Sequence, residues 1–321
     1  MATYIIRRTI QAIPILFGVA VISFAIVQLA PGSPIDRFRT PQVRPETLEN
    51  LIRLYGLDKP IHEQFVNWIT AFVQVWREEA WGYSLSVQAG RPVRDVVLER
   101  VPATMLLGGT ALGVTALLAV PIGILAAVKQ YSWADKAITT FATIGYAIPS
   151  FLLGLYLLYF GGVVLRAFPL FGMRDLQGGG DPLDVAHHLV LPVASLAIQQ
   201  IAGWARYVRA KMLEVLNQDY VRTAKAKGLS FNRVTFKHAL RNALIPVITL
   251  FGLTLPSLLS GAVITEVIFS WPGLGQLGVL AVAQRDYPLV LAFVMLGGFG
   301  VVTGNLLADV LYGVADPRIK Y

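Results

Sequence analysis

Few residues of this chain have the types and spacing that chemical catalysis needs. The 321 residues include no cysteine, which excludes disulfides, thiolate metal sites and cysteine nucleophiles. The adjacent pair His187-His188 has aspartates nearby but no defined ligand spacing, so we expect no metal site there. The glycines at 178–180 lack the lysine and the serine or threonine of a phosphate-binding loop, and no such loop occurs elsewhere in the sequence. We therefore expect that this chain is not an enzyme and does not itself hydrolyse ATP.

The charged segment that stands out is basic and lies between two long apolar runs. From Arg206 to Arg241 there are nine lysines and arginines against two acidic residues. Gly228 is predicted to end a helix, as glycine does after many helices. A short helix with basic and apolar groups can insert into a groove of a partner; the alternative is a solvated loop that contacts anionic lipid. The residues predicted to share one face of this helix, at spacings of three and four, are Leu213, Leu216, Tyr220 and Ala224.

Composition places these residues in a membrane protein. The chain is 55% hydrophobic and 14% charged, with a mean hydropathy of +0.60, whereas soluble domains carry about 25% charged residues. Lipid must therefore cover part of the surface. The net charge of +8 is typical of lysine and arginine held at the cytoplasmic face of a membrane protein. We therefore expect contact with membrane lipid and no nucleic-acid partner.

Six uncharged runs approach the roughly 20 apolar residues that cross a bilayer, and six spans place both termini on one side. That side is predicted to be the cytoplasm, because most basic residues outside the long 31–100 segment then lie inside. We therefore predict an all-α polytopic protein of the prokaryotic plasma or inner membrane. The predicted spans are Thr9–Ala30, Val101–Val128, Ala137–Leu165, Leu189–Ala205, Asn242–Thr265 and Pro288–Ala308.

The sizeable polar segment 31–100 is predicted to form a small helical cap outside the membrane. A helix is expected from Pro45 to a stop at Gly56, and an apolar stripe from Ile61 to Trp76 predicts a second helix. We expect a structural lid for the outer mouth, with direct substrate selection as the alternative. The predicted organisation is a transmembrane helix at 1–30, the cap at 31–100 and a five-helix transmembrane core at 101–321 that contains the basic segment 206–241.

Several polar or turn-forming residues in or beside the spans could line a pathway or a gate. Pro246 and Pro256 interrupt the fifth span, and a kinked helix with small polar residues suits a pore lining, while kinks that only pack are an equally open alternative. Glu266 and Asp309 lie near predicted span ends, where we expect an interfacial, solvated position. The turn after the fifth span is predicted to be a tight re-entry loop, or else an outer gate or a contact with an external binding protein. The pathway and gate candidates are Gln199, Ser257, Ser260, Glu266, Trp271 and Pro272.

Many short segments, each in its expected topological place, together resemble the dipeptide and oligopeptide branch of ABC-importer permeases. The segment from Asp219 to Ser230, followed by 238–246, is similar to the coupling segment of that branch. It departs from the general family pattern, because Arg222-Thr223-Ala224 stands where Glu-Ala-Ala is usual, and Arg241 stands in place of a proline. The other similar segments are Arg7–Gly32, Gly90–Val93, Glu99–Thr104, Ile148–Gly154, Glu266–Gly275, Arg285–Pro288, Asn305–Asp309, Tyr312 and Asp316–Ile319.

The resemblance implies a type I ABC-importer permease with six transmembrane helices, the first-type subunit of a peptide importer. Such a subunit forms half of a translocation pathway and couples it to ATPase subunits. The implied partners are a second permease subunit, two ATPase subunits that use ATP and Mg, and an extracytoplasmic substrate-binding protein; the branch also handles nickel and other small solutes. The implied ATPase-coupling residues are Tyr220, Arg222, Thr223, Ala224, Lys227, Gly228, Leu229 and Phe231.

The alternative function is that of an ion-coupled secondary transporter of a small solute. Such transporters are expected to hold paired ionisable groups at mid-membrane, and many are built from internal repeats. The sequence shows no repeat and no ionisable pair that is clearly placed there.

Overall fold

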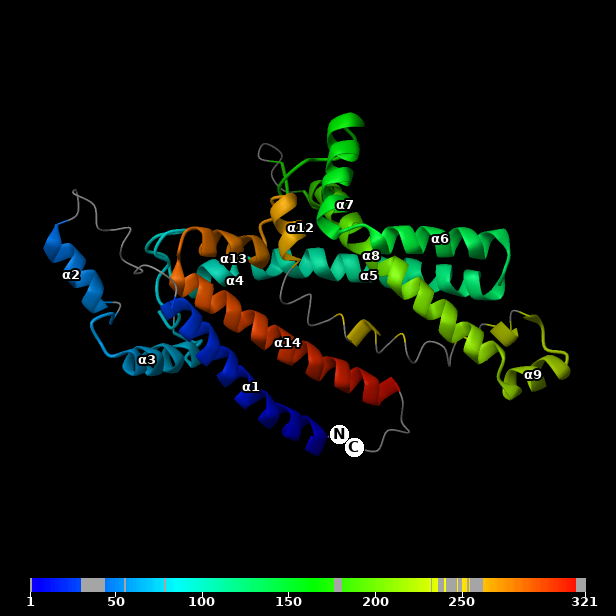
Figure 1. The fold of residues 1–321 in the computed structure, drawn as a ribbon, viewed down its shortest axis with the longest axis horizontal. Coiled ribbons are helices and arrows are strands. Elements are labelled where there is room, and N and C mark those ends of the chain that lie inside the picture. Colours follow the sequence, from blue (N-terminus) through cyan, green and yellow to red (C-terminus); the bar gives the residue numbers. More distant parts are fainter. Residues whose placement is uncertain are drawn as a thin grey trace.

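The fold consists of helices of very different lengths (Figure 1). The structure, a computed structural model, describes residues 2–29, 44–54, 56–77, 79–175, 181–231, 233–235, 240, 247, 250–252, 254 and 262–315. Within these ranges the regular elements are helical, apart from one isolated bridge between Tyr83 and Pro92. The helices are α1 (Ala2–Leu29), α2 (Pro45–Leu54), α3 (Ile61–Val73), α4 (Val93–Leu98), α5 (Val101–Val128), α6 (Trp133–Ala147), α7 (Ser150–Leu157), the π-helical η2 (Leu158–Val164), α8 (Pro182–Leu216), α9 (Asp219–Ala226), α12 (Val263–Ile268), α13 (Leu274–Ala283) and α14 (Tyr287–Ala315).

Four stretches of helix in the described part of the chain are long and apolar enough to cross a membrane. They coincide with four of the six predicted spans, although α8 extends the predicted Leu189–Ala205 at both ends. The pair formed by α6 and the α7–η2 segment makes a fifth span if its two halves are counted together. The predicted span Asn242–Thr265 lies largely outside the described residues. The four stretches are Ile6–Leu29, Val93–Val128, Pro182–Leu216 and Tyr287–Val310.

Helices α5 and α8 form the central contact of the transmembrane part. Their shared cluster includes the fully buried Met212 and the nearly buried Trp204. They approach closely at Gly123 of α5, where an added Cβ would lie 2.6 Å from the Cβ of Val208 and 2.7 Å from the carbonyl oxygen of Ala205. Small residues at such crossings allow helices in a membrane to pack backbone to backbone. The glycine is therefore needed for the packing of α8 on α5.

Helices α1 and α14 pack against each other, and α1 begins at the end of the molecule where α14 finishes (Figure 1). An ion pair joins these ends, with the Arg8 Nε 3.2 Å from an Asp309 carboxylate oxygen. The Asp309 side chain is 29% exposed, so it is partly solvated and also paired with a cation of the neighbouring helix. The start of α1 and the end of α14 therefore lie at the same end of the molecule, as an even number of spans requires.

The predicted span Ala137–Leu165 is not one straight helix. Helix α6 ends at Ala147, the backbone of Ile148 is extended with ψ of 124°, and the two helical halves meet at 102°. Pro149 explains the break, because proline disfavours helical geometry in the residue before it and has no N–H to donate. The prediction of one continuous helix was wrong for this reason.

The described residues before α5 include two helices of the predicted cap. Helix α2 starts at Pro45, and Gly56 takes a φ of +63°, which confirms the predicted start and stop. Helix α3 lies against α1 through aromatic rings, with Phe24 stacked on Trp68 at 5.7 Å between ring centroids. The predicted stripe ends early, because Trp76 lies beyond α3 and is 74% exposed.

Residues 80–97 share a hydrophobic cluster with α13 and α14. A buried carboxylate reinforces this contact, since Asp286 accepts hydrogen bonds from the Ser84 hydroxyl at 2.6 Å and from the backbone N–H groups of Ser86 and Val87 at 2.9 and 3.0 Å. The segment before α4 is thus tied to the turn before α14.

The α5–α8 crossing generates a stability prediction. We expect Gly123→Ala to lower the free energy of unfolding by about 1–3 kcal/mol, because the new methyl group would overlap Val208 and Ala205 in a packed interface. Thermal unfolding of the detergent-solubilised protein measures the effect.

Gly113 of the same helix provides the matched control. It is exposed, and an added Cβ would meet no atom within 4 Å. We expect Gly113→Ala to leave stability unchanged or to raise it slightly through helix propensity. Equal unfolding temperatures for the two variants would show that the α5–α8 interface is not closely packed at Gly123.

Candidate functional site

A short amphipathic helix, α9, lies beyond the end of α8 (Figure 1). Gln218 precedes it in an extended conformation, and Gly228 follows it with a φ of +74°. The Gly228 N–H donates to the carbonyl of Lys225 at 3.0 Å, which closes the helix end. Since the left-handed conformation strains any residue with a Cβ, glycine ends this helix as predicted.

One face of α9 is buried against the end of α8. Val221 is fully buried and Ala224 is 6% exposed, and together with Val234 they form a small cluster. Val215 and Leu216 of α8 pack against this cluster. Among the predicted coupling residues, Ala224 therefore holds α9 in place rather than presenting itself to a partner.

The uncovered surface of α9 and of the turn after it presents two aromatic rings and several cations. Tyr220 is 43% exposed and Phe231 is 60% exposed. Gly228 also lies on the surface, and Leu229 is half-buried. Exposed rings surrounded by positive charge suit a partner groove that is apolar in its centre and acidic at its rim. The exposed polar residues of this surface are Arg222, Thr223, Lys225 and Lys227.

The predicted continuous helix face from 213 to 224 was wrong. Helix α8 ends at Leu216, and the Asn217 side chain donates to the carbonyl of Leu213 at 2.9 Å. The chain then extends at Gln218 before α9 starts. The first two residues of the predicted face therefore belong to α8 and the last two to α9, because asparagine competes for backbone groups at a helix end.

A second polar site joins α5, α12 and α13 around the buried carboxylate of Glu266. This residue is fully buried. One carboxylate oxygen accepts the Thr104 hydroxyl at 2.8 Å, and the other accepts the N–H of Gln276 at 3.0 Å. The Thr104 oxygen in turn accepts the N–H of Leu274 at 2.8 Å. The carboxylate thus sits at the N-terminus of α13, where the helix dipole favours negative charge.

The turn between α12 and α13 has room for this carboxylate only because it contains glycine. A Cβ at Gly273 would overlap the Glu266 carboxyl group, and a Cβ at Gly275 would lie 2.6 Å from the Cα of Val263. Trp271 is fully buried, and its indole N–H donates to the carbonyl of Ala103 at 2.8 Å. The turn is therefore clamped onto α5.

These contacts correct one expectation about the outer turn. Glu266 was expected at a solvated interface, and it is instead buried and hydrogen-bonded. The reason is tertiary: α5 supplies a hydroxyl and α13 supplies an N–H, so the carboxylate needs no water. The structure brings together three of the predicted gate residues, Glu266, Trp271 and the half-buried Pro272.

The remaining pathway candidates lie elsewhere. Gln199 of α8 donates its side-chain amide to the carbonyl of Ile148, at the break between α6 and α7. This carbonyl is freed because the chain leaves the helix at Pro149. Ser257 and Ser260 lie outside the described residues.

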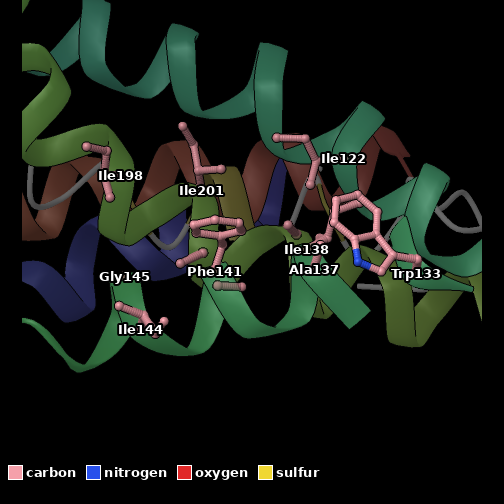
Figure 2. A pocket seen from close by; sticks show the side chains of 12 residues that line it. Ile122, Trp133, Ala137, Ile138, Phe141, Ile144, Gly145, Ile198 and Ile201 are labelled. Carbon is pink, nitrogen blue, oxygen red and sulfur yellow. The ribbon is translucent and has the colours of Figure 1, made fainter. Parts of the chain in front are cut away.

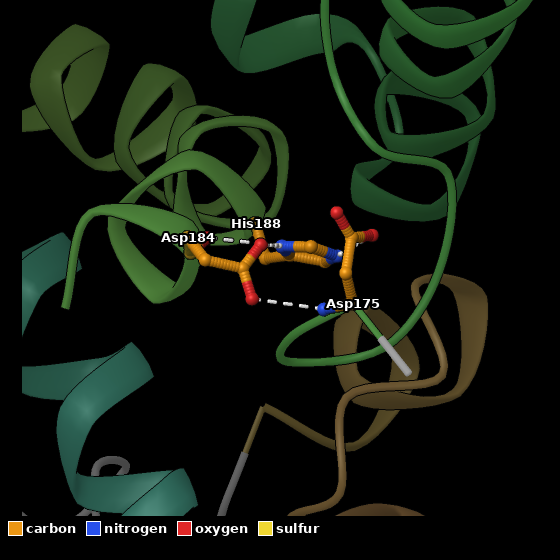
Figure 3. Close-up of side chains that lie close together, drawn as sticks. All are labelled: Asp175, Asp184 and His188. Atoms are coloured by element: carbon orange, nitrogen blue, oxygen red, sulfur yellow. Dashed lines mark hydrogen bonds and ion pairs between the residues drawn. The ribbon is translucent and has the colours of Figure 1, made fainter. Parts of the chain in front are cut away.

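The two adjacent histidines point to different partners. His187 contacts the carbonyl of Ala167 at 2.9 Å. His188 is buried, and its Nδ1 lies 3.0 Å from an Asp184 carboxylate oxygen, while its Nε2 lies 3.7 Å from Asp175 (Figure 3). The three residues of Figure 3 could offer one ligand atom each within 4.8 Å of one another.

This cluster is explained by polar contacts within the chain. The Asp184 carboxylate already contacts His188 and accepts the backbone N–H of Asp175 at 2.9 Å (Figure 3). Only the His188 Nε2 and the Asp175 carboxylate then remain for an ion, fewer than the three protein ligands of a catalytic zinc site. We therefore regard the cluster as a clasp between the 166–175 segment and the start of α8.

An apolar groove of about 570 Å³ runs along α6 beside α5 and α8 (Figure 2). Trp133, Phe141 and Ile144 of α6 line one side, and Ile198 and Ile201 of α8 line the other. The lining offers almost no hydrogen-bond partner, so the groove suits a lipid chain or an apolar helix face rather than a polar solute.

Thr104 was not singled out from the sequence as a functional candidate. A hydroxyl in an apolar helix usually bonds to its own backbone, as the Thr115 hydroxyl does with the carbonyl of Ala111. Thr104 differs because a segment 162 residues away places a carboxylate beside it. Local sequence carries no signal of such a partner.

Two family models cover the chain almost from end to end. The model described as "Binding-protein-dependent transport system inner membrane component" matches residues 119–321. The model for the N-terminal part of binding-protein-dependent transport system membrane components matches residues 1–108.

Several curated relatives match over their full length or nearly so. The chain is 45% identical over 321 residues to the oligopeptide transport system permease protein AppB of Bacillus subtilis, with both chains fully covered. It is 39% identical to the di/tripeptide transport system permease protein DppB of Pseudomonas aeruginosa, over all of this chain and 99% of that one. It is 36% identical to the glutathione transport system permease protein GsiC of Escherichia coli K12, again with both chains covered.

A solved structure supports the fold. A chain of the MetNI methionine ABC transporter, in an inward-facing conformation, matches with a TM-score of 0.54 at 16% identity, over 70% of this chain and 98% of that one. At this identity the likeness concerns the arrangement of helices alone.

The Glu266 site generates a prediction about stability. We expect Thr104→Val to lower the free energy of unfolding by about 1.5–3 kcal/mol, because it removes a hydrogen bond to a buried carboxylate and leaves the N–H of Leu274 without its acceptor. Chemical or thermal unfolding of the purified protein measures the change.

The same substitution at Thr115 is the matched control. That residue is equally buried in α5, but its hydroxyl bonds only within its own helix. We expect Thr115→Val to change stability by less than about 1 kcal/mol. A Thr104 variant as stable as the Thr115 variant would contradict the assigned network.

Proposed function

The chain belongs to the family of binding-protein-dependent inner membrane transport components, and from this membership we propose that it forms half of the translocation pathway of an ATP-driven peptide importer. Full-length similarity to permeases of oligopeptide and di/tripeptide transport systems is the observation that carries the proposal. Four long apolar helices and one bent pair fit a multi-pass membrane subunit. Since polar solutes cross lipid only at high cost, a peptide needs such a protein-lined route.

Chemical energy enters, in this proposal, through α9. The exposed rings of Tyr220 and Phe231, with the cations near them, dock into one ATPase subunit. A second ATPase subunit docks on the second permease in the same way. ATP and Mg²⁺ are bound and used in those partners. Closure of the ATPases on ATP changes the relative free energies of the inward- and outward-facing states, because the ATPases bind the two states with different affinity.

The opposite side receives substrate from an extracytoplasmic binding protein. The segments there are anchored to the transmembrane helices through Asp286, Glu266 and Trp271. With the binding protein outside the cell, α9 and both termini lie in the cytoplasm. This is consistent with the concentration of basic residues around α9. The ion-coupled transporter considered from the sequence loses support, because the family depends on a binding protein.

Reconstitution tests the proposed function. The chain, assembled in liposomes with a second permease, two ATPase subunits and a substrate-binding protein, should import radiolabelled di- and oligopeptides only when ATP is supplied to the ATPase side. Peptide uptake driven by an ion gradient without ATPases would contradict the proposal. ATP-dependent uptake of another solute, with no uptake of peptides, would contradict the substrate class alone.

The docking role of α9 generates a further prediction. We expect Tyr220→Ala with Phe231→Ala to weaken binding of the ATPase subunits at least ~30-fold, since aromatic anchors at an interface centre contribute about 2 kcal/mol or more. Co-purification and binding titrations of the ATPases on permease held in nanodiscs measure the loss.

Phe171 supplies the control. This ring is 56% exposed and lies in the 166–175 segment, on the other side of the membrane in the proposed orientation. Phe171→Ala should bind the ATPases as the unaltered protein does. If the α9 variant also bound them normally, the ATPases would dock elsewhere.

A further inference from the structure

A buried ion pair connects α6 to α8 two turns before α8 ends. The Arg209 guanidinium grips both carboxylate oxygens of Asp135, with Nε–Oδ1 and Nη2–Oδ2 distances of 2.6 and 2.8 Å. The Asp135 side chain is 4% exposed and the Arg209 side chain 26%. A two-pronged charged contact of this kind fixes both the distance and the orientation of its partners.

Asp135 also closes the turn between α5 and α6. Its carboxylate accepts the backbone N–H of Tyr131 at 2.9 Å, and Tyr131 takes a left-handed φ of +64°. Ser132 caps α6 by accepting the N–H of Asp135 at 3.3 Å. Asp135 therefore joins α6, α8 and the turn that follows α5 at a single point.

The apolar packing of α6 is too sparse to hold this helix firmly in place. Only three of the 15 residues of α6 are buried, namely Asp135, Ala142 and Gly145. The groove along α6 leaves part of its contact with α8 open (Figure 2). Polar contacts, which are directional, therefore contribute to the register of α6 on α8.

A second polar contact lies at the far end of α6. The Gln199 side-chain amide of α8 donates to the carbonyl of Ile148, the first residue after α6. Helix α8 thus holds α6 at its start through Arg209 and at its end through Gln199. Beyond Ile148 the chain turns by 102° into α7.

The end of α8 is also the part of the core that α9 touches. Val215 and Leu216 pack against the buried face of α9, about two turns beyond Arg209 along the helix. A force applied to α9 therefore acts on α8 close to the ion pair.

We propose that Arg209 and Asp135 are positioning residues that make α6 and α8 move as one body, so that a displacement of α9 reaches the break at Ile148–Pro149. This inference rests on the proposed function, because it assigns the route by which the docked ATPases act on the pathway. The two polar contacts transmit the displacement, and the break is where α7 can change direction relative to α6.

The first test separates coupling from assembly. In the reconstituted importer, Asp135→Asn and Arg209→Gln should each lower the peptide imported per ATP hydrolysed about 10-fold, within the range of typical coupling between sites. Hydrolysis stimulated by the loaded binding protein should persist. Glu99→Gln, which breaks the exposed Arg91–Glu99 pair, is the control and should keep the normal ratio. If Asp135→Asn and Arg209→Gln both kept the normal ratio of peptide imported to ATP hydrolysed, the proposal would be overturned.

The second test leaves the ion pair intact, so it decides the question even if those variants fail to assemble. The chain has no cysteine, so Lys136→Cys and Ala210→Cys introduce two unique thiols at exposed positions of α6 and α8. Bridging them with a bifunctional thiol reagent should leave ATP-driven uptake unchanged. Uptake blocked by the bridge would show that the helices move apart during transport, which overturns the inference while the proposed function stands.

Discussion

Helices α5 and α8 cross at Gly123, where the backbone of one helix approaches the side chains of the other without an intervening Cβ. The buried cluster around this crossing includes Trp204, Val208 and Met212 of α8. Several contacts of the sites described above start from these two helices. Thr104 of α5 binds the outer turn, and Gln199 and Arg209 of α8 bind α6.

Buried carboxylates connect this core to the segments around it. Glu266 accepts its donors from α5 and α13, Asp286 from residues 84–87, and Asp135 from α8 and the preceding turn. Each carboxylate accepts hydrogen bonds from groups brought from another part of the chain, because an unpaired charge is costly away from water. Such contacts specify one arrangement of helices that would otherwise be held by nonspecific apolar packing.

The two sides of the molecule are built differently, and the difference fits the proposed function. The turn between α12 and α13 is held by hydrogen bonds and a buried ring, as at Glu266 and Trp271. At the end of α8, a small apolar cluster holds α9 against Val215 and Leu216. A rigid frame at one end and a projecting helix at the other suit a subunit that receives force at one place and changes shape at another.

The sequence alone was sufficient for the helical membrane class and for four of the spans, because these depend on runs of apolar residues that any local window reveals. The end of α9 at Gly228 was predictable for a similar reason, since a left-handed helix end favours glycine. The turn at Asn217 and the break at Pro149 were missed. Proline is a local signal, but the long apolar run around Pro149 outweighed it in the assignment.

Only the tertiary structure decided what the polar residues do. Glu266 was expected to be an interfacial carboxylate, and Asp135 was not singled out from the sequence; each acquires its role from a partner 162 or 74 residues away. Hydropathy and spacing report which residues prefer lipid or water, and they are short-range properties of the chain. The pairing of a buried charge with its donors depends on which helices meet, and that was settled by packing at places such as Gly123.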